Sequence, residues 1–128
     1  MTKEEAVREH RKMWSWIASE SRRLWRCVRK DEYLAKFWDR PNPALDCFCC
    51  EYGYLRKKYI QDNRCRYCPI NWNSKAEHFP CQYLDEEDHQ NEIWSGLYGE
   101  WLLDCMRGDW EHAADIADMI AELAESED

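Results

Sequence analysis

The chain has few of the patterns that mark a β-sheet or an enzyme. Alternating apolar and polar residues, which indicate a half-buried strand, are absent except over residues 52–60, where one small β-hairpin is an alternative. The four glycines form no phosphate-cradling loop, and the four histidines form no His-Glu-x-x-His helix and no His-x-Glu step of a zinc deaminase. The sequence therefore predicts a mainly α-helical protein that is not an enzyme.

Two further absences limit its surroundings and its partners. The chain opens with Met-Thr-Lys-Glu-Glu and has no apolar leader segment, so we expect it to stay in the reducing cytoplasm. From residue 85 onward Arg107 is the single Lys or Arg against 15 acids, whereas residues 1–84 carry 17 Lys and Arg against 11 acids. The acidic and basic side chains are thus divided between the two ends of the chain, at −14 and +6.

Cysteine, by contrast, is abundant, with eight residues in a chain of 128. Two paired steps, Cys47-Phe-Cys-Cys50 and Cys65-Arg-Tyr-Cys68, are separated by 14 residues, none of them histidine. Two thiolates that lie two residues apart can bind one ion, and a second pair completes the tetrahedron that Zn²⁺ prefers. The pattern predicts one structural zinc ion per chain, bound by Cys47, Cys50, Cys65 and Cys68. Such an ion would organise residues 41–83, which have little periodic hydrophobicity of their own.

The ligand set has alternatives. Cys49 can replace a neighbour, and Cys81 can do so alone or together with His78. Cys27 and Cys105 lie in helical patterns, where small buried thiols are expected. Disulfides do not suit a reducing compartment, and a thioredoxin-like pair needs a strand and a helix that neither paired step has around it.

Apolar residues recur at steps of three and four from Lys3 to about Arg29, which predicts a long N-terminal helix. Its stripe comprises Val7, His10, Trp14, Ile17, Ser21, Leu24 and Val28, with Met13 and Trp25 beside it. A lone histidine on such a stripe is expected to be packed rather than to bind a metal. A second helix over residues 32–38, capped by Asp31, should end before Pro41.

The acidic C-terminal part is again helical in pattern. An apolar face over residues 93–105 is interrupted by Gly96 and Gly99, which weaken the helix or allow another element to approach closely. Gly108 should end this helix, and Asp109 should cap a last helix that is rich in alanine and isoleucine.

The uneven charge has three interpretations. The acidic helices can face solvent or lie against the basic residues from Arg22 to Lys30. Alternatively, the acidic part binds a basic protein groove. The expected contacts are Asp85, Glu86, Glu87, Asp88 and Glu92, with Trp16 and Trp72, two tryptophans that fall on no apolar face. In the third interpretation, the basic patches at Arg22 to Lys30 and Arg56 to Arg66 bind DNA or RNA, against repulsion from the acidic segment.

Several stretches resemble a group of small uncharacterised proteins from phages and prophages of Gram-positive bacteria. They are Cys47-Phe-Cys-Cys50-Glu51-Tyr52, Cys65-Arg-Tyr-Cys68-Pro69-Ile70-Asn71-Trp72, Cys81, Tyr98, Trp101, the last helix and the run from Glu4 to Trp14. The likeness extends over nearly the whole chain. It implies an accessory phage protein in the host cytoplasm, and it carries over no catalytic residue.

Together these patterns predict a single domain, with helices in residues 1–40, a zinc-bound irregular segment in 41–83 and acidic helices in 84–128. The expected function is non-catalytic: the protein binds and inhibits a host nucleic-acid-handling or defence protein, as an anti-CRISPR inhibitor does, through its acidic surface. The alternative is a nucleic-acid-binding zinc module or transcriptional regulator. The N-terminal stripe would also allow a homodimer, and no membrane partner is expected.

Overall fold

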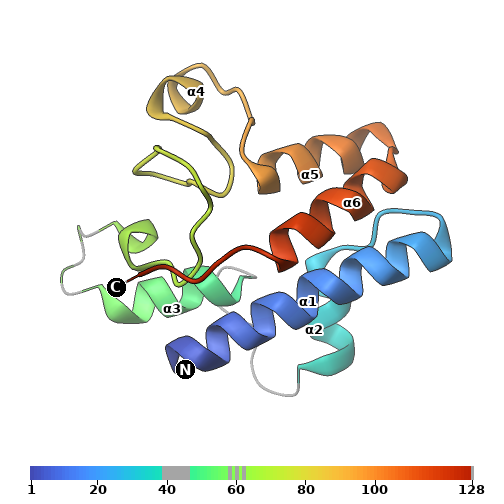
Figure 1. The fold of residues 1–128 in the computed structure, drawn as a ribbon, viewed down its shortest axis with the longest axis horizontal. Helices are drawn as coiled ribbons and strands as arrows, with labels where there is room; N and C mark the ends of the chain where they lie inside the picture. Colours follow the sequence, from blue (N-terminus) through green and yellow to red (C-terminus); the bar gives the residue numbers. More distant parts are fainter. Residues whose placement is uncertain (39–46, 58, 60, 62, 128) are drawn as a thin grey trace.

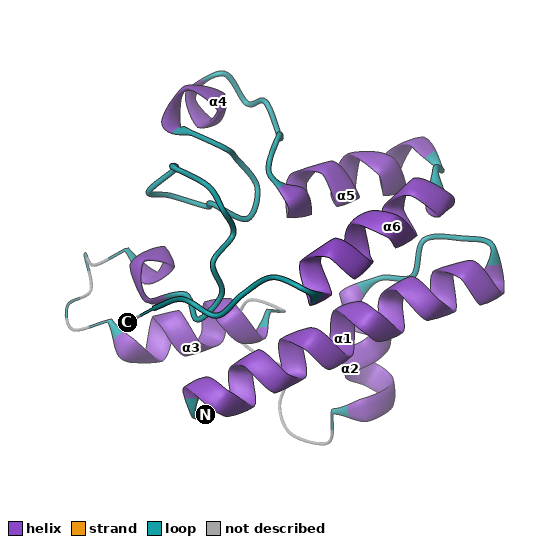
Figure 2. Ribbon diagram, viewed as in Figure 1, coloured by secondary structure: helices purple, strands orange, loops and turns teal. Residues whose placement is uncertain are grey.

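A computed structural model gives the fold and describes all residues except 39–46, 58, 60, 62 and 128. The described residues form six α-helices, one 3-10 helix and no named strand (Figures 1 and 2). In chain order these elements are α1 (Lys3–Leu24), α2 (Lys30–Phe37), α3 (Phe48–Arg56), η1 (Arg64–Tyr67), α4 (Glu86–Gln90), α5 (Leu97–Arg107) and α6 (Trp110–Ala121). The predicted mainly α fold is confirmed. Within the described part of the chain, no helix is long and apolar enough to cross a membrane.

Helix α1 begins where the sequence indicates but ends earlier. The Thr2 side chain accepts the N–H of Glu5 at 3.0 Å, which caps the first turn. The predicted end near Arg29 is wrong, because Trp25 takes a left-handed conformation with a φ of 57°. Instead of continuing the helix, the N–H of Val28 donates to the Ser21 hydroxyl oxygen at 3.0 Å. Val28 therefore reaches the core from a loop, while Trp25 is 76% exposed.

Helix α2 begins two residues before the predicted start. The Glu32 carboxylate accepts the N–H of Arg29 at 2.7 Å, so Glu32 rather than Asp31 caps the first turn. Asp31 instead pairs with the Arg29 guanidinium at 2.9 Å. The buried side chains Tyr33 and Leu34 then attach α2 to the core.

The core lies where α1 packs against α6, with α5 against α6 in turn (Figure 1). The rings of Trp14 in α1 and Trp101 in α5 meet edge to face, with centroids 5.0 Å apart. The turn between α5 and α6 is the predicted one, since Gly108 is left-handed and the Asp109 side chain accepts the N–H of His112 at 3.2 Å. The predicted start of α5 near residue 93 is wrong, because Ile93 is half exposed and the helix begins at Leu97.

The chain that follows α6 joins α1 to the middle of the protein. Lys3 donates to the carbonyl oxygen of Ser126 at 2.7 Å, so the two ends of the described chain meet (Figure 1). An isolated antiparallel bridge joins Ile70 to Glu125. The segment that carries Cys68 is thereby held by a tail that also contacts α1.

The middle of the chain is more helical than predicted. The suggested hairpin is wrong for residues 52–56, which belong to α3, while residues 58 and 60 lie outside the described part. Gly53 in α3 permits close packing with η1, because a Cβ atom there would overlap the carbonyl oxygen of Arg64. The start of α5 is similarly close to residues 81–83: a Cβ on Gly96 would lie 2.7 Å from the nitrogen of Tyr83. Close approach is therefore the reason for Gly96.

The edge-to-face packing predicts that Trp101→Ala will lower the free energy of unfolding by about 3–5 kcal/mol, as truncation of a buried aromatic does. Trp25→Ala removes the same side chain from a position that is 76% exposed, so its effect should stay below about 1 kcal/mol. Urea unfolding of both variants measures the difference. Equal losses at the two positions would contradict this assignment of the core.

Candidate metal centre

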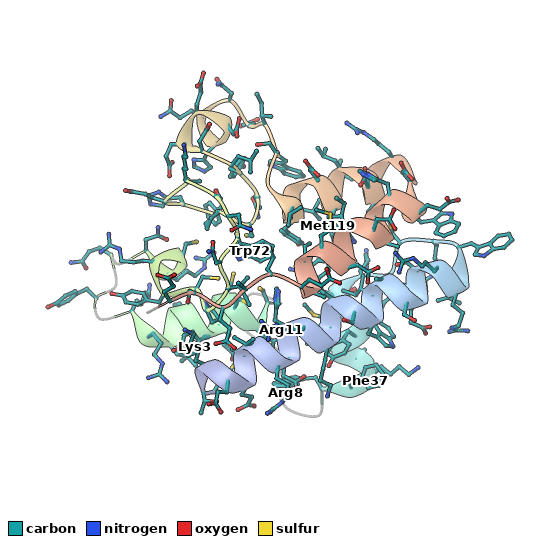
Figure 3. All side chains as sticks on the ribbon, viewed as in Figure 1. Lys3, Arg8, Arg11, Phe37, Trp72 and Met119 are labelled. Atoms are coloured by element: carbon teal, nitrogen blue, oxygen red, sulfur yellow. The ribbon has the colours of Figure 1, made fainter. Side chains whose placement is uncertain are left out.

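Six of the eight cysteines line one small cavity. They are Cys47, Cys49, Cys50, Cys65, Cys68 and Cys81, and Arg64, Trp72 and Pro80 complete the lining. Figure 3 labels Trp72, which lies close to several of the yellow sulfur atoms. The cavity volume is about 20 Å³, which is room for one water-sized occupant. All four predicted ligands and both alternatives, Cys49 and Cys81, thus surround a space of the size of a single ion.

Three separate parts of the chain bring these thiols together. Cys47 precedes α3, which carries Cys49 and Cys50 on its first turn. Cys65 lies in η1 and Cys68 follows it directly, and the contact of η1 with Gly53 brings both pairs to the same place. Cys81 is fixed from a third direction, because its carbonyl oxygen accepts the N–H of Tyr98 in α5 at 2.8 Å.

The thiols contact one another in a row that runs Cys50, Cys47, Cys49, Cys68. Hydrogen bonds from the side chains of Cys49 and Cys50 hold the pKa of Cys47 well below its usual value. A hydrogen bond from Cys49 likewise lowers the pKa of Cys68, whereas burial raises the pKa of Cys49. Two sulfurs of the cavity are therefore ready to be thiolates, which is the form that binds metals.

Backbone amides also point at these sulfurs. The N–H of Phe79 donates to the Cys65 sulfur at 3.4 Å. The N–H of Cys50 donates to Cys47, and the N–H of Ile70 donates to Cys68. Such bonds stabilise thiolate charge around a metal. Three of the four predicted ligands therefore have a backbone donor.

Positive charge reaches the cavity from Lys30 and Arg64. Burial lowers the pKa of Lys30, but the combined effect of Cys47, Tyr98 and Cys50 outweighs burial, so the pKa is raised. The Lys30 ammonium also lies 4.3 Å from the centre of the Tyr98 ring. Arg64 lines the cavity, whereas Arg56 and Lys57 lie over tyrosine rings of α3.

His10 was missed as a neighbour of the centre. Its Nδ1 lies 3.3 Å from the Cys49 sulfur, and its Nε2 lies 3.3 Å from the carbonyl oxygen of Ile120. Burial lowers the pKa of His10, so the ring is neutral at pH 7. A neutral ring with its proton on Nε2 can donate to Ile120, which leaves the Nδ1 lone pair facing the Cys49 thiol. The only sequence signal was the position of His10 on the buried stripe of α1.

The donors fit Zn²⁺ in chemistry and number, because thiolates in a one-ion cavity suit a tetrahedral site. The sulfurs do not yet form a closed set: among the described residues, no three cysteine sulfurs lie within 4.8 Å of one another. Binding would draw them inward by small movements of side chains. The choice of Cys47, Cys50, Cys65 and Cys68 over Cys49 or Cys81 stays a prediction.

The other two cysteines lie outside this lining. Cys27, in the loop after α1, hydrogen-bonds to Cys105 in α5, and burial raises the pKa of both thiols. Each of these two thiols thus has the other as a hydrogen-bond partner. This agrees with the expectation that they are small packed thiols. His78, the possible companion of Cys81, is exposed and lies beside Glu86.

The two tryptophans expected at a partner surface are placed differently. Trp72 is only 8% exposed, because its ring packs edge-on against His10 and covers the cysteine cavity. The exposure that a partner contact needs is therefore small at Trp72, and its role in binding stays a prediction. Trp16 is half-buried, and its ring centroid lies 5.7 Å from that of Tyr33 and 5.5 Å from that of Phe37.

The acids expected at that surface divide into two groups. Asp85 caps α4, Glu86 accepts the N–H groups of Glu77 and His78, and Asp88 accepts the Ser95 hydroxyl. These three carboxylates hold the loop before α5 together. Glu87 and Glu92 are exposed and remain available to a partner.

Comparison with known proteins gives no class or family for this chain. No family model matches it, and neither a curated protein nor a solved structure matches it. The resemblance to phage proteins thus has no support from these comparisons, and function must be argued from the site and the surface.

We expect the purified protein to contain one Zn²⁺ per chain, measured by elemental analysis together with native mass spectrometry. Cys47→Ser should lose the metal, because this sulfur is the best prepared thiolate of the cavity. Cys27→Ser is the matched control and should keep it, since Cys27 lies outside the cavity lining. A metal-free protein, or disulfides among the cavity cysteines, would overturn the assignment.

The contact at Gly53 gives a second prediction for this site. Gly53→Ala should lower stability by about 1–3 kcal/mol through overpacking and weaken zinc binding, because η1 must move away from α3. Gly108→Ala is the control: its left-handed backbone is strained by a Cβ, but the site is distant from the cavity. Thermal unfolding and competition with a zinc-binding dye separate the two effects. Unchanged zinc affinity in Gly53→Ala would rule out this role of the glycine.

Proposed function

We propose that this is a non-catalytic, zinc-stabilised interaction protein that binds and inhibits a nucleic-acid-handling or defence protein of a bacterial host. The acidic C-terminal part supplies the binding surface, and a phage origin would fit this role. The observation that carries the proposal is an imbalance in the charged side chains. The arginines from Arg22 to Arg29 are paired with acids of the chain, whereas many of the C-terminal acids are exposed.

The arginines from Arg22 to Arg29 each contact an acid. Arg22 binds Asp115 and Asp118 of α6 at 2.9 and 2.7 Å. The other pairs are Arg23 with Glu20 at 2.6 Å, Arg26 with Glu32 at 2.7 Å and Arg29 with Asp31 at 2.9 Å. Exposed pairs of this kind stabilise little, but they cancel the positive field that a phosphate backbone would need. This speaks against the alternative of nucleic-acid binding through that patch.

Fewer of the acids in the C-terminal part are offset by a basic side chain. Glu87, Glu92, Glu111, Glu122, Glu125 and Glu127 are exposed, and Arg107 is the single Lys or Arg after residue 84. A surface of this sign attracts Lys- and Arg-rich proteins and speeds their association. Proteins that handle nucleic acids carry such basic grooves, which is why they are the proposed class of partner.

An aromatic surface adjoins the acids at one end of α6. Trp25 is 76% exposed, and its ring is parallel to that of Trp110 with centroids 6.4 Å apart. A groove of about 280 Å³ beside it is lined by Arg22, Trp110, Glu111 and Asp115. Tryptophan faces next to carboxylates suit the guanidinium groups of a partner. Trp25 and Trp110 thus take the place that Trp16 and Trp72 were expected to fill.

The test is capture of the partner from nuclease-treated host lysate, followed by titration of the identified protein and an assay of its activity. Glu111→Lys should weaken binding about tenfold or more, because it reverses the charge of the groove. Glu4→Lys is the matched control, since Glu4 is also an exposed first-turn glutamate, in α1. Binding should weaken with added salt.

A gel shift with random DNA tests the alternative in parallel. Micromolar or tighter DNA binding that is lost in Arg66→Glu, with no protein captured, would overturn the proposed function. If Glu111→Lys and Glu4→Lys weaken the binding of a captured partner equally, net charge and not the groove is the cause. That result would exclude the proposed surface.

A further inference from the structure

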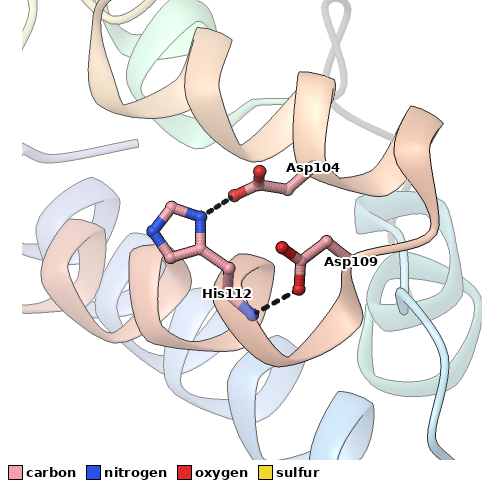
Figure 4. Close-up of side chains that lie close together, drawn as sticks. All are labelled: Asp104, Asp109 and His112. Carbon is pink, nitrogen blue, oxygen red and sulfur yellow. Dashed lines mark hydrogen bonds and ion pairs between the residues drawn. The ribbon is translucent and has the colours of Figure 1, made fainter.

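A second group of metal-binding side chains lies far along the chain from the cysteine cavity. Asp104 is in the last turn of α5, and Asp109 and His112 begin α6 (Figure 4). One donor atom from each of the three lies within 4.8 Å of the others. Asp104 is only 6% exposed, whereas Asp109 and His112 are open to solvent. Asp104 thus forms the buried side of the group, and Asp109 and His112 form its solvent-accessible side.

The contact between Asp104 and His112 points to a missing positive charge. His112 Nδ1 lies 2.6 Å from Asp104 Oδ2. Despite this distance, Oδ2 is a buried oxygen with no hydrogen-bond partner among the described residues, so the two atoms form an ion pair without hydrogen-bond alignment. Buried carboxylate oxygens are nearly always hydrogen-bonded. A ring nitrogen and a buried carboxylate oxygen that converge from two helices, with no aligned hydrogen bond between them, can both bind one cation.

The local field also favours a cation. Asp104 lies at the C-terminal end of α5, where the helix dipole is negative, and Asp109 adds a second carboxylate beside it. A bound divalent cation would offset the charge of both carboxylates. Burying the Asp104 carboxylate then has a compensating charge.

We propose that Asp104, Asp109 and His112 form a divalent cation site that is separate from the cysteine centre. The ligands would be Asp104 Oδ2, His112 Nδ1 and the Asp109 oxygen other than Oδ1, since Oδ1 accepts the N–H of His112 at 3.2 Å. One imidazole and two carboxylates suit Mn²⁺, Fe²⁺ or Co²⁺, with water at the remaining positions. The ion would clamp the end of α5 to the start of α6 across the turn at Gly108. The inference is independent of the proposed function.

The probe is Mn²⁺, followed by electron paramagnetic resonance as free Mn²⁺ disappears, in the zinc-loaded full-length protein. Manganese prefers nitrogen and oxygen donors, so the thiols of the cysteine cavity do not compete for it. We expect one saturable site per chain. Asp104→Asn and His112→Gln should each weaken binding about tenfold or more, and Mn²⁺ should raise the melting temperature of the unmodified protein but not of these two variants.

Glu111→Gln is the control, because it removes one charge from the residue next to His112 without removing a ligand. It should change the affinity less than about twofold. His112 is exposed, so its variant will fold even where Asp104→Asn disturbs the buried end of α5. Absence of saturable Mn²⁺ binding, or equal losses in the control and in His112→Gln, would overturn the proposal and leave a simple ion pair.

Discussion

The buried imidazole of His10 is the point on which both halves of the protein depend. One ring nitrogen faces the carbonyl oxygen of Ile120 in α6, and the other faces the sulfur of Cys49 in α3. A neutral ring is the side chain that can satisfy an acceptor on one side and a donor on the other. The packing of α1 on α6 and the position of the cysteine cavity are therefore set by the same residue, and Trp72 closes the space between them.

Acidic and basic residues are separated along the sequence, but in the folded protein they are separated only in part. The basic residues near the end of α1 are joined to acids of α2 and α6, so the fold uses them internally. Asp85, Glu86 and Asp88 are likewise used to hold a loop. What remains outside is an acidic surface with two parallel tryptophans at one end. This combination suits a partner with basic and planar groups better than it suits a phosphate backbone.

The sequence was sufficient wherever structure depends on near neighbours. Helical spacing, the Thr2 region, Gly108 and the Asp109 cap are local signals, and the last helix and its start follow from them. The paired cysteines indicated a common site, and their sulfurs line one cavity. The burial of Trp72 and the approach of His10 to the cavity depend on contacts between distant segments. No short-range sequence pattern indicates these contacts, because each of these residue types occurs equally in other environments.

The pairing of α1 with the tail after α6 has a consequence for how the molecule folds. The contacts that close the core join residues 110 positions apart, as in His10 with Ile120, and 123 apart, as in Lys3 with Ser126. Helical proteins usually fold fast because their contacts are local, whereas distant contacts carry a loop-closure cost before they form. This helical protein has contacts between its two ends in addition to its local helical contacts. Its rate-limiting step should be the meeting of its two ends, and the cysteine segment between them would be enclosed as they meet.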